Sequence, residues 1–326
     1  MKSSFIIRII KLQFSIIIPV YNRPKEIDDL LTSFLKQNFK EDYEILIVED
    51  GSTKKSDVIL KKYTSKLNIK YFYKENSGAG ASRNFGMQKA TGNYFIILDS
   101  DVVLPSHYLT QVNKALQNKY TDAFGGPDTA HKSFTPMQKA INYAMTSFLT
   151  TGGIRGKKKG VGKFQLRSFN LGISKKAFLV TQGFSNMKTG EDIDLTFRLW
   201  KQGFQTQLIT PAFVYHKRRS TLQQFFKQTF SFGIARPILN RRYPESKKIT
   251  FWFPTLFMLG FLSSLLFKVF GFQYLLYVYY FYFIVLFVDA TIQNKSIKIA
   301  LYSIVTTFIQ FLGYGSGFFK SQFLRK

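Results

Sequence analysis

Two aspartates separated by one serine directly follow a short apolar run of this sequence. Asp99 and Asp101 flank Ser100, and the preceding residues 94–98 have the composition of a buried strand. Carboxylates with this spacing suit a hard divalent cation such as Mg2+ or Mn2+. Such a cation would neutralise the diphosphate of a leaving nucleotide. Because Asp and Ser are also common in turns, an ordinary turn explains the triplet equally well when it is taken alone.

A second group of acids lies much later in the chain, where a helix is expected to begin. Glu191, Asp192 and Asp194 directly follow Gly190. The residues after them place apolar side chains at helical spacing, namely Leu195, Leu199 and Trp200. Acids in the first turn of a helix also stabilise it through its dipole, so their position by itself assigns no chemical role.

Short apolar runs alternate with helical patterns through the first hundred residues. Residues 15–20, 45–48 and 94–98 are typical of buried strands, and residues 70–73 indicate a further short strand. Between the first two runs, apolar side chains recur at helical spacing, at Ile27, Leu30, Leu31, Phe34 and Leu35. The alternation predicts an α/β fold with an open, mostly parallel sheet and flanking helices. Ligands bind beyond the carboxyl ends of the strands in such sheets, where this chain places its acids.

A loop of small residues, 76–82, precedes another predicted helix and the basic residue Arg83. The third glycine of a dinucleotide-binding G-x-G-x-x-G sequence would fall at Arg83, so that type of site is not expected. A basic residue entering a helix suits a diphosphate, with a surface salt bridge as the alternative. Residues 151–163 combine glycines with lysines and predict a mobile basic loop, or equally a solvated loop without a role.

The charge balance of the chain is strongly basic. Lys and Arg number 46 against 19 Asp and Glu, a formal net charge of +27, which favours anionic surroundings such as nucleic acid or a membrane leaflet. The cations cluster beside apolar segments and no base-reading motif is present, so no nucleic-acid partner is expected. The chain has no cysteine, which excludes disulfides, cysteine zinc sites and thiol nucleophiles.

The C-terminal residues 250–326 predict a membrane domain with two to three transmembrane helices. The segments 250–267 and 272–292 are long and apolar enough to cross a bilayer. The third, 297–319, carries polar residues and fits either a packed span or an interfacial helix. Residues 221–249 predict an amphipathic interfacial or linker region, rich in aromatic and basic side chains.

The cations at 241–248 place the N-terminal part of the chain on the cytoplasmic side of an integral membrane protein, under the positive-inside rule. Three crossings would, however, carry the cations at the very end of the chain to the opposite side. These are Lys320, Arg325 and Lys326.

Five segments, in the order IIIPVYN, ILIVEDGS, NSGAGASRNFG, LDSD and GFSNMKTGEDIDLTFRLWKQG, make the chain resemble family 2 glycosyltransferases of GT-A fold. The resemblance covers roughly residues 14–220. It implies a catalytic domain at 1–220 that uses a nucleotide-sugar donor, most simply a UDP-sugar, together with Mn2+ or Mg2+. It also implies an inverting transfer, in which the acceptor attacks the anomeric carbon opposite the nucleotide.

The resemblance also implies roles for individual residues. The donor nucleotide and diphosphate are expected to be held by Pro19, Val20, Tyr21, Glu49, Asp50, Arg83, Asp99, Ser100 and Asp101. Many members have Asp-Asp where this chain has Glu49 and Asp50. The expected metal ligands are Asp99, Asp101 and His216, and the expected catalytic base is Asp192, which would take the proton of the acceptor hydroxyl. For Asp192 a helix cap, and for His216 a purely structural role, are the alternatives.

Processive members carry a Q-x-x-R-W motif after this helix, and no Arg-Trp pair follows Gln223, Gln224 or Gln228. Transfer of a single sugar is therefore expected, and the apolar C-terminal segments favour a lipid-linked or surface-glycan acceptor and contact with membrane lipids. The alternative is a non-catalytic GT-A-like membrane protein that binds or scaffolds.

Overall fold

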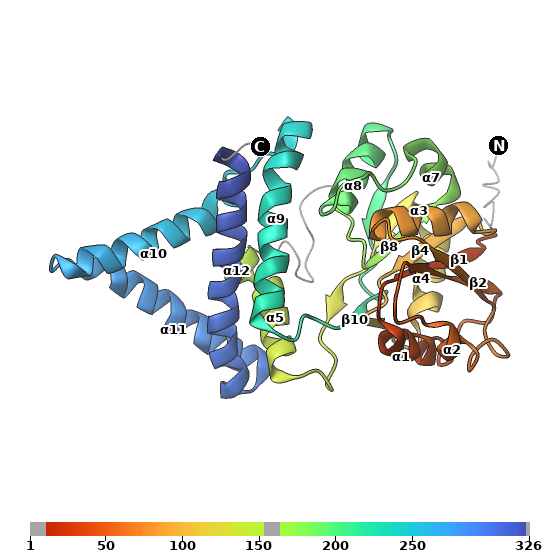
Figure 1. The fold of residues 1–326 in the computed structure, drawn as a ribbon, viewed down its shortest axis with the longest axis horizontal. Coiled ribbons are helices and arrows are strands. Elements are labelled where there is room, and N and C mark those ends of the chain that lie inside the picture. The colour runs from red at the N-terminus through yellow and green to blue at the C-terminus, as the bar shows by residue number, and fades with distance from the viewer. Residues whose placement is uncertain (1–10, 153–163, 324–326) are drawn as a thin grey trace, which may run out of the picture. The chain divides into compact units, whose positions relative to one another are not determined.

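The computed structural model describes residues 11–152 and 164–323, which form two compact units (Figure 1). Of the described residues, the first unit contains 11–129 and 164–216, and the second contains 130–152 and 217–323. Contacts thus group residues 130–152 with the C-terminal helices, although they precede position 220 in the chain. Beyond Gly152, the basic loop predicted at 151–163 lies outside the described residues.

A seven-stranded sheet is the centre of the first unit, and six of its strands point the same way. Only β8 (Asn170–Ser174) runs antiparallel to its neighbours, β4 (Tyr94–Leu98) and β6 (Ala123–Gly125). The predicted α/β fold with a mostly parallel sheet is therefore confirmed. In spatial order the strands are β3 (Ile69–Lys74), β2 (Tyr43–Asp50), β1 (Phe14–Val20), β4 (Tyr94–Leu98), β8 (Asn170–Ser174), β6 (Ala123–Gly125) and β9 (Thr206–Leu208).

Helices cover both faces of this sheet. Alternate residues of β1 point to opposite faces, so Ile16 and Ile18 belong to one apolar core and Ile17 to the other. The first core is closed by α1 (Pro24–Phe34), α2 (Asp57–Leu60) and α4 (Tyr108–Asn118). The second is closed by α3 (Ala79–Lys89), α7 (Lys175–Thr181) and α8 (Glu191–Lys201). Burial on both sides explains why the strands read as continuous apolar runs.

A small three-stranded sheet completes the first unit. In it β10 (Val214–His216) pairs antiparallel with β5 (Val102–Val103) and parallel with β7 (Asp128–Thr129). Strands of two or three residues leave no periodic pattern, and the sequence did not predict them. They bring together residues that lie far apart in the chain.

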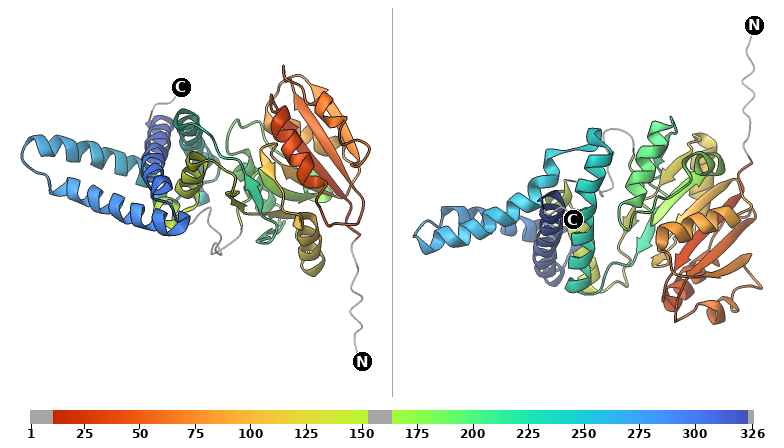
Figure 2. Two further views of the ribbon diagram at one scale, coloured as in Figure 1. Left: turned by 90° about the horizontal axis from the view of Figure 1, so that it is seen from below. Right: turned by 45° about the horizontal axis from the view of Figure 1, so that its top comes forward.

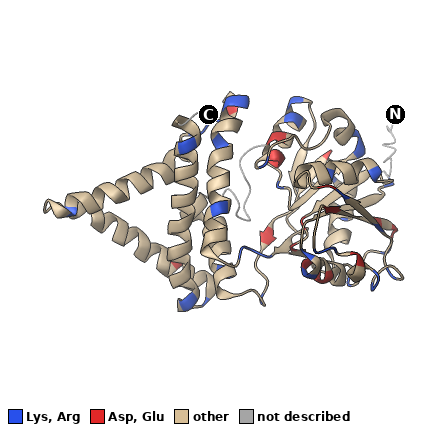
Figure 3. Cartoon of the chain, viewed as in Figure 1, with Lys and Arg blue, Asp and Glu red and all other residues tan. Residues whose placement is uncertain are grey.

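The second unit is helical (Figure 2). Three of its helical segments are long and apolar enough to cross a membrane, namely Ile249–Val269, Tyr274–Asn294 and Ile297–Phe323. Figure 3 shows few charged residues along the first two of these segments. The helices are α5 (Pro136–Thr146), α6 (Phe148–Thr151), α9 (Leu222–Arg242), α10 (Phe253–Val269), α11 (Tyr274–Asn294) and α12 (Ile297–Phe323), with short 3-10 turns at Pro244–Ser246 and Ile249–Trp252.

Glu44, at the start of β2, ties three segments of the first unit together. Its carboxylate accepts hydrogen bonds from the Ser15 hydroxyl (2.6 Å) and the Thr91 amide (2.6 Å), and it pairs with Lys70 Nζ (2.7 Å). Burial alone would raise the pKa of Glu44, but these partners outweigh it and lower the pKa from 4.5 to about 2. Because the folded-state pKa lies below the unfolded one, this stabilisation is present above about pH 4.5 and is lost as the pH falls towards 2.

Glu44→Gln is therefore expected to lower the free energy of unfolding by about 3 kcal/mol at pH 7 and to flatten its decrease between pH 4.5 and 2. Thermal unfolding of the purified full chain across this pH range measures both effects. Asp42→Asn, at an exposed acid just before β2, is the control and should follow the parent curve. A Glu44→Gln curve that runs parallel to the parent at every pH would refute the assignment.

Candidate metal and donor site

Asp99, Asp101 and His216 meet beyond the carboxyl end of β4. The two aspartates lie between β4 and β5, and pairing of β5 with β10 sets His216 opposite Val102. His216 Nε2 lies 3.1 Å from Asp101 Oδ1. One ligand atom from each of the three side chains lies within 4.8 Å of the others. The structure thus brings together all three residues that the sequence proposed as metal ligands.

The chemistry of this trio fits a divalent cation. Two carboxylates and one imidazole provide the oxygen-rich donor set that suits Mn2+ or Mg2+. Burial alone would raise the pKa of Asp101, but His216 and Arg23 outweigh it and hold the pKa below its ordinary value. Asp101 is therefore a carboxylate at neutral pH, which is the form that binds a cation.

Arg23 is a member of the site that the sequence analysis did not single out. It precedes α1, and its Nη1 donates to Asp101 Oδ2, while Oδ1 of the same carboxylate faces His216. Burial would lower the pKa of Arg23, but Asp101 outweighs it and raises the pKa. Its position directly after the IIIPVYN segment was the only signal in the sequence.

Asp128 and Phe169 hold the other side of the His216 ring. Asp128 Oδ2 lies 3.6 Å from His216 Nδ1, and β7 and β10 run side by side at this point. The Phe169 ring lies 4.9 Å from the imidazole, centroid to centroid. A carboxylate behind an imidazole fixes the ring orientation in many metal sites. Sequence reasoning missed Asp128 because the segment FGGPD carries no motif of its own.

Arg83 joins the two acidic motifs from the middle of α3. Its Nη2 donates to Asp99 Oδ1 (2.8 Å), and its Nη1 donates to Glu191 Oε1 (2.9 Å). The guanidinium also lies over the Phe184 ring. Burial raises the pKa of Glu191; Arg83 opposes this shift and Asp192 adds to it. The alternative given for Arg83, a surface salt bridge, is replaced by a buried one that joins distant segments, while its predicted contact with the diphosphate stays a prediction.

Arg83→Met is expected to destabilise the chain by about 3–5 kcal/mol, because it leaves two largely buried carboxylates without their counter-ion. Lys89→Met, an exposed position on the same helix, is the matched control. Thermal unfolding of both variants in the same detergent measures the difference. Equal midpoints would show that Arg83 does not stabilise the site.

Asp192 lies in the first turn of α8. Its Oδ2 accepts from the Ser168 amide (3.1 Å), and its Oδ1 accepts from the Ile193 amide (2.8 Å). The neighbouring Asp194 has a different role, because it is buried and pairs with Arg198 Nε (2.9 Å). The acidic cluster therefore divides into a carboxylate at the helix start and one that supports the helix.

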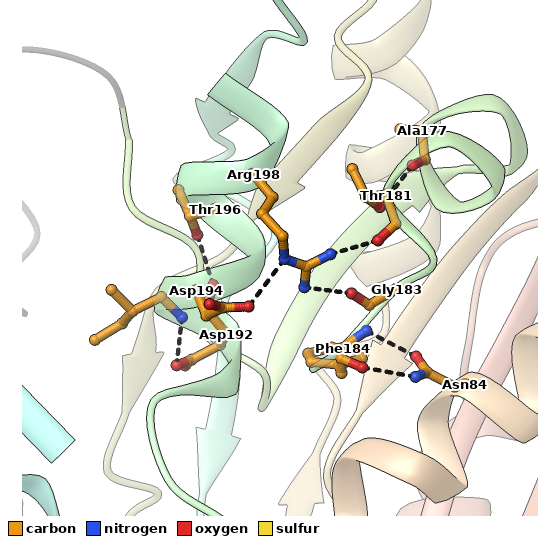
Figure 4. A network of polar contacts seen from close by, with 10 residues as sticks. Asn84, Ala177, Thr181, Gly183, Phe184, Asp192, Asp194, Thr196 and Arg198 are labelled. Carbon is orange, nitrogen blue, oxygen red and sulfur yellow. Dashed lines mark hydrogen bonds and ion pairs between the residues drawn. The ribbon is translucent and has the colours of Figure 1, made fainter. Parts of the chain in front are cut away.

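A network around Arg198 fixes the position of α8 (Figure 4). Arg198 donates to the carbonyl oxygens of Thr181, the last residue of α7, and of Gly183, just beyond that helix. Asn84 of α3 exchanges hydrogen bonds of 2.8 Å with the amide and carbonyl of Phe184. The loop before α8 is thereby held to two helices, which sets where Asp192 stands.

The residues predicted to hold the nucleotide are distributed around the ends of β1 and β2. Pro19 and Val20 are buried at the end of β1, and Tyr21 beyond them is 53% exposed. Asp50 binds Lys74 Nζ (2.6 Å) and the amides of residues 77 and 78 (both 2.9 Å). Burial would raise the pKa of Asp50, but Lys74, the Ser77 amide and the Ser82 hydroxyl outweigh it and lower the pKa.

Two of the predicted donor residues point into the protein. Glu49 is fully buried and accepts from the Ser56 amide (2.9 Å), so it holds the turn after β2. Ser100 is buried between Asp99 and Asp101. The predicted loop 76–82 is also shorter than expected, because α3 already begins at Ala79.

Comparisons with known proteins bear on this site. TarS of Staphylococcus aureus, a poly(ribitol-phosphate) beta-N-acetylglucosaminyltransferase, is 34% identical over 144 residues, which cover 40% of this chain and 25% of TarS. This chain thus spans a quarter of that relative. A glucuronosyltransferase of Methanococcus voltae that acts on a dolichyl N-acetylglucosaminyl phosphate is 26% identical, covering 75% of this chain and 79% of that protein.

Solved structures share the fold. TarS residues 1–349 in complex with UDP-GlcNAc match with a TM-score of 0.51 at 18% identity, covering 95% of this chain and 92% of that one. The mannosyltransferase PcManGT from Pyrobaculum calidifontis, in complex with GDP-Man and Mn2+, matches with a TM-score of 0.57 at 14% identity, covering 96% and 88%. Residues 15–178, half of the chain, match the profile described as Glycosyl transferase family 2. The chain therefore belongs to glycosyl transferase family 2.

Proposed function

We propose that this chain transfers a single sugar from a nucleotide-sugar donor to an acceptor at a membrane, with inversion at the anomeric carbon and with Mn2+ or Mg2+. The observation that carries this proposal is the clustering of Asp99, Asp101 and His216 within 4.8 Å beyond β4. PcManGT, which shares the fold, holds GDP-Man together with Mn2+. A cation held by the trio would neutralise the charge that develops on the leaving diphosphate.

Other side chains of the first unit bind the donor and take up the proton of the acceptor. Arg83, fixed by Asp99 and Glu191, places a positive charge beside the diphosphate side of the site. The carboxylate of Asp192 takes the proton of the acceptor hydroxyl as its oxygen attacks the anomeric carbon. The bond from that carbon to the diphosphate breaks, and the nucleoside diphosphate leaves. Pro19, Val20, Tyr21 and Asp50 line the nucleotide side.

The donor we propose is a UDP-sugar. The TarS structure of this fold contains UDP-GlcNAc, which supports the choice of uridine, whereas PcManGT contains a guanosine donor. Both are sugars on a nucleoside diphosphate, and a metal and arginine site suits that shared group. A panel of UDP- and GDP-sugars determines which nucleotide base the donor carries.

The acceptor we propose is a lipid-linked or surface glycan. The enzyme we propose is an integral membrane protein whose catalytic unit faces the cytoplasm. Three helices that are long and apolar enough to cross a membrane support this proposal. The Methanococcus voltae relative is named for a dolichyl-phosphate acceptor. Residues 1–220 would form the catalytic domain, 221–249 an interfacial region and 250–326 the membrane domain.

Release of nucleoside diphosphate tests the proposal. The purified full chain is incubated with a panel of UDP- and GDP-sugars, with Mn2+, with Mg2+ or with a chelator. We expect release from a UDP-sugar that requires the metal and increases with a lipid-linked acceptor. Donor binding in calorimetry with no release across the acceptor panel would instead support a non-catalytic binding protein.

A further inference from the structure

The three apolar helices of the second unit do not run in the same direction. In Figure 1, α12 stands beside α9, whereas α10 and α11 leave that pair on one side and meet at a tip. The left view of Figure 2 looks nearly along α9 and α12, and the hairpin of α10 and α11 extends sideways from them. A helix that lies across a membrane-spanning hairpin lies close to the plane of the membrane.

One face of α12 is built to pack against protein. Small and polar residues recur along it at helical spacing, from Ser303 through Thr306 and Gly313 to Gly317. A Cβ at Gly317 would lie 2.2 Å from the carbonyl oxygen of Phe230, so only glycine lets α9 approach this closely. The Thr306 hydroxyl donates to the carbonyl of Ala140 in α5 (3.2 Å).

The other face of α12 is apolar and touches the hairpin only near the base of the hairpin. Phe311 packs on Phe257 (4.8 Å between ring centroids), and Phe308 packs on Phe261 (5.3 Å). Beyond Phe261, most residues of α10 are exposed, and so are most residues in the first half of α11, where Leu276 and Tyr279 are buried. Within an 18-residue apolar stretch of each segment, 44% of the residues are buried for α12, against 17% and 22% for the two hairpin segments.

The hairpin itself has the composition of a segment surrounded by lipid. Residues 249–294 contain two charged side chains, Lys268 at the tip and Asp289 near the base. The Tyr143 hydroxyl of α5 donates to Asp289 (2.5 Å), so this carboxylate has a polar partner within the protein. Each hairpin segment has 21 residues, or about 32 Å of helix, enough to cross a bilayer. Exposed Tyr274 and Tyr277 beside Lys268 suit the far membrane interface.

We propose that the chain crosses the membrane twice, with the hairpin of α10 and α11. In this proposal α12 lies beside α9 in the membrane interface at the base of the hairpin. The apolar face of α12 then meets lipid and the hairpin, and its small-residue face meets α5 and α9. Lys320 ends on the same side as Arg241, Arg242, Lys247 and Lys248, which removes the conflict that three crossings create. This arrangement of α10, α11 and α12 does not depend on the proposed catalysis.

The absence of native cysteine allows a direct test with single-cysteine variants of the full chain. Exposed positions are available at the hairpin tip (Gln273→Cys), at the start and end of α12 (Lys298→Cys and Gln322→Cys) and in the first unit (Lys201→Cys). A membrane-impermeant maleimide is applied to sealed vesicles of both orientations. The cysteine-free parent is the control for background labelling.

We expect the variants at 201, 298 and 322 to be labelled in the same vesicle orientation and the variant at 273 in the opposite one, each with at least about a tenfold preference. Labelling at 322 from the side that labels 273 would establish a third crossing and overturn the proposal. Labelling at 273 from the side that labels 201 would also overturn it, because the hairpin would not then cross.

Discussion

Replacing Asp101 by asparagine is expected to lower the rate of sugar transfer by about three orders of magnitude. Asp101 is the buried member of the metal trio, and its two oxygens face His216 and Arg23. Loss of its charge removes a metal ligand and with it several kcal/mol of stabilisation of the leaving diphosphate, and each 1.4 kcal/mol is about a tenfold change in rate. The rate is measured as nucleoside diphosphate released at saturating donor and metal.

A second measurement separates this effect from a loss of folding. Mn2+ should raise the unfolding temperature of the parent, because a ligand of the native state stabilises it, and should leave that of Asp101→Asn unchanged. Asp42→Asn, at an exposed acid remote from the trio, should retain both the activity and the Mn2+ effect. Parent-like activity in folded Asp101→Asn would show that this carboxylate is not a ligand.

Asp192→Asn is expected to lower kcat by about 10²–10⁴-fold, the range typical of a general base, with KM for the donor unchanged. Asparagine can still accept the hydrogen bond from the Ser168 amide that Asp192 accepts, but it cannot take a proton. The Mn2+ stabilisation should persist, which distinguishes this variant from Asp101→Asn. Initial rates over a range of donor and acceptor concentrations give both constants.

The neighbouring Asp194→Asn is the matched control for this experiment. Asp194 pairs with Arg198 and supports α8, so its loss should lower the unfolding temperature while kcat of the folded fraction changes only a few-fold. A kcat for Asp192→Asn within a few-fold of the parent would remove Asp192 from the reaction and favour its alternative role as a helix cap.

The central strands and their helices were predictable because their burial produces local patterns of apolar residues in the sequence. β1, β2 and β4 are buried on both faces, so each is a continuous apolar run, and α1 shows its buried stripe at helical spacing. The strands β5, β7 and β10 have two or three residues each and are held only by pairing with distant segments. Asp128 was missed for this reason.

The candidate site was predictable where a motif is local and hidden where partners come from afar. The spacing of Asp99 and Asp101 indicates a candidate metal site. Arg23 is recognised as part of this site only because it contacts Asp101 in the fold. Glu49 has a contact that no local pattern indicated, because its carboxylate accepts a hydrogen bond from the Ser56 amide, and its predicted contact with the donor stays a prediction. The packing of α5 with the C-terminal helices is likewise a long-range contact without a local pattern.

The most direct test of the central claim is anomalous diffraction at the manganese absorption edge, from crystals grown with Mn2+ and UDP. We predict one anomalous peak at bonding distance from carboxylate oxygens of Asp99 and Asp101 and from a ring nitrogen of His216, with the diphosphate on its open side. A manganese ion bound elsewhere, with these three side chains making no contact to it, would contradict the account.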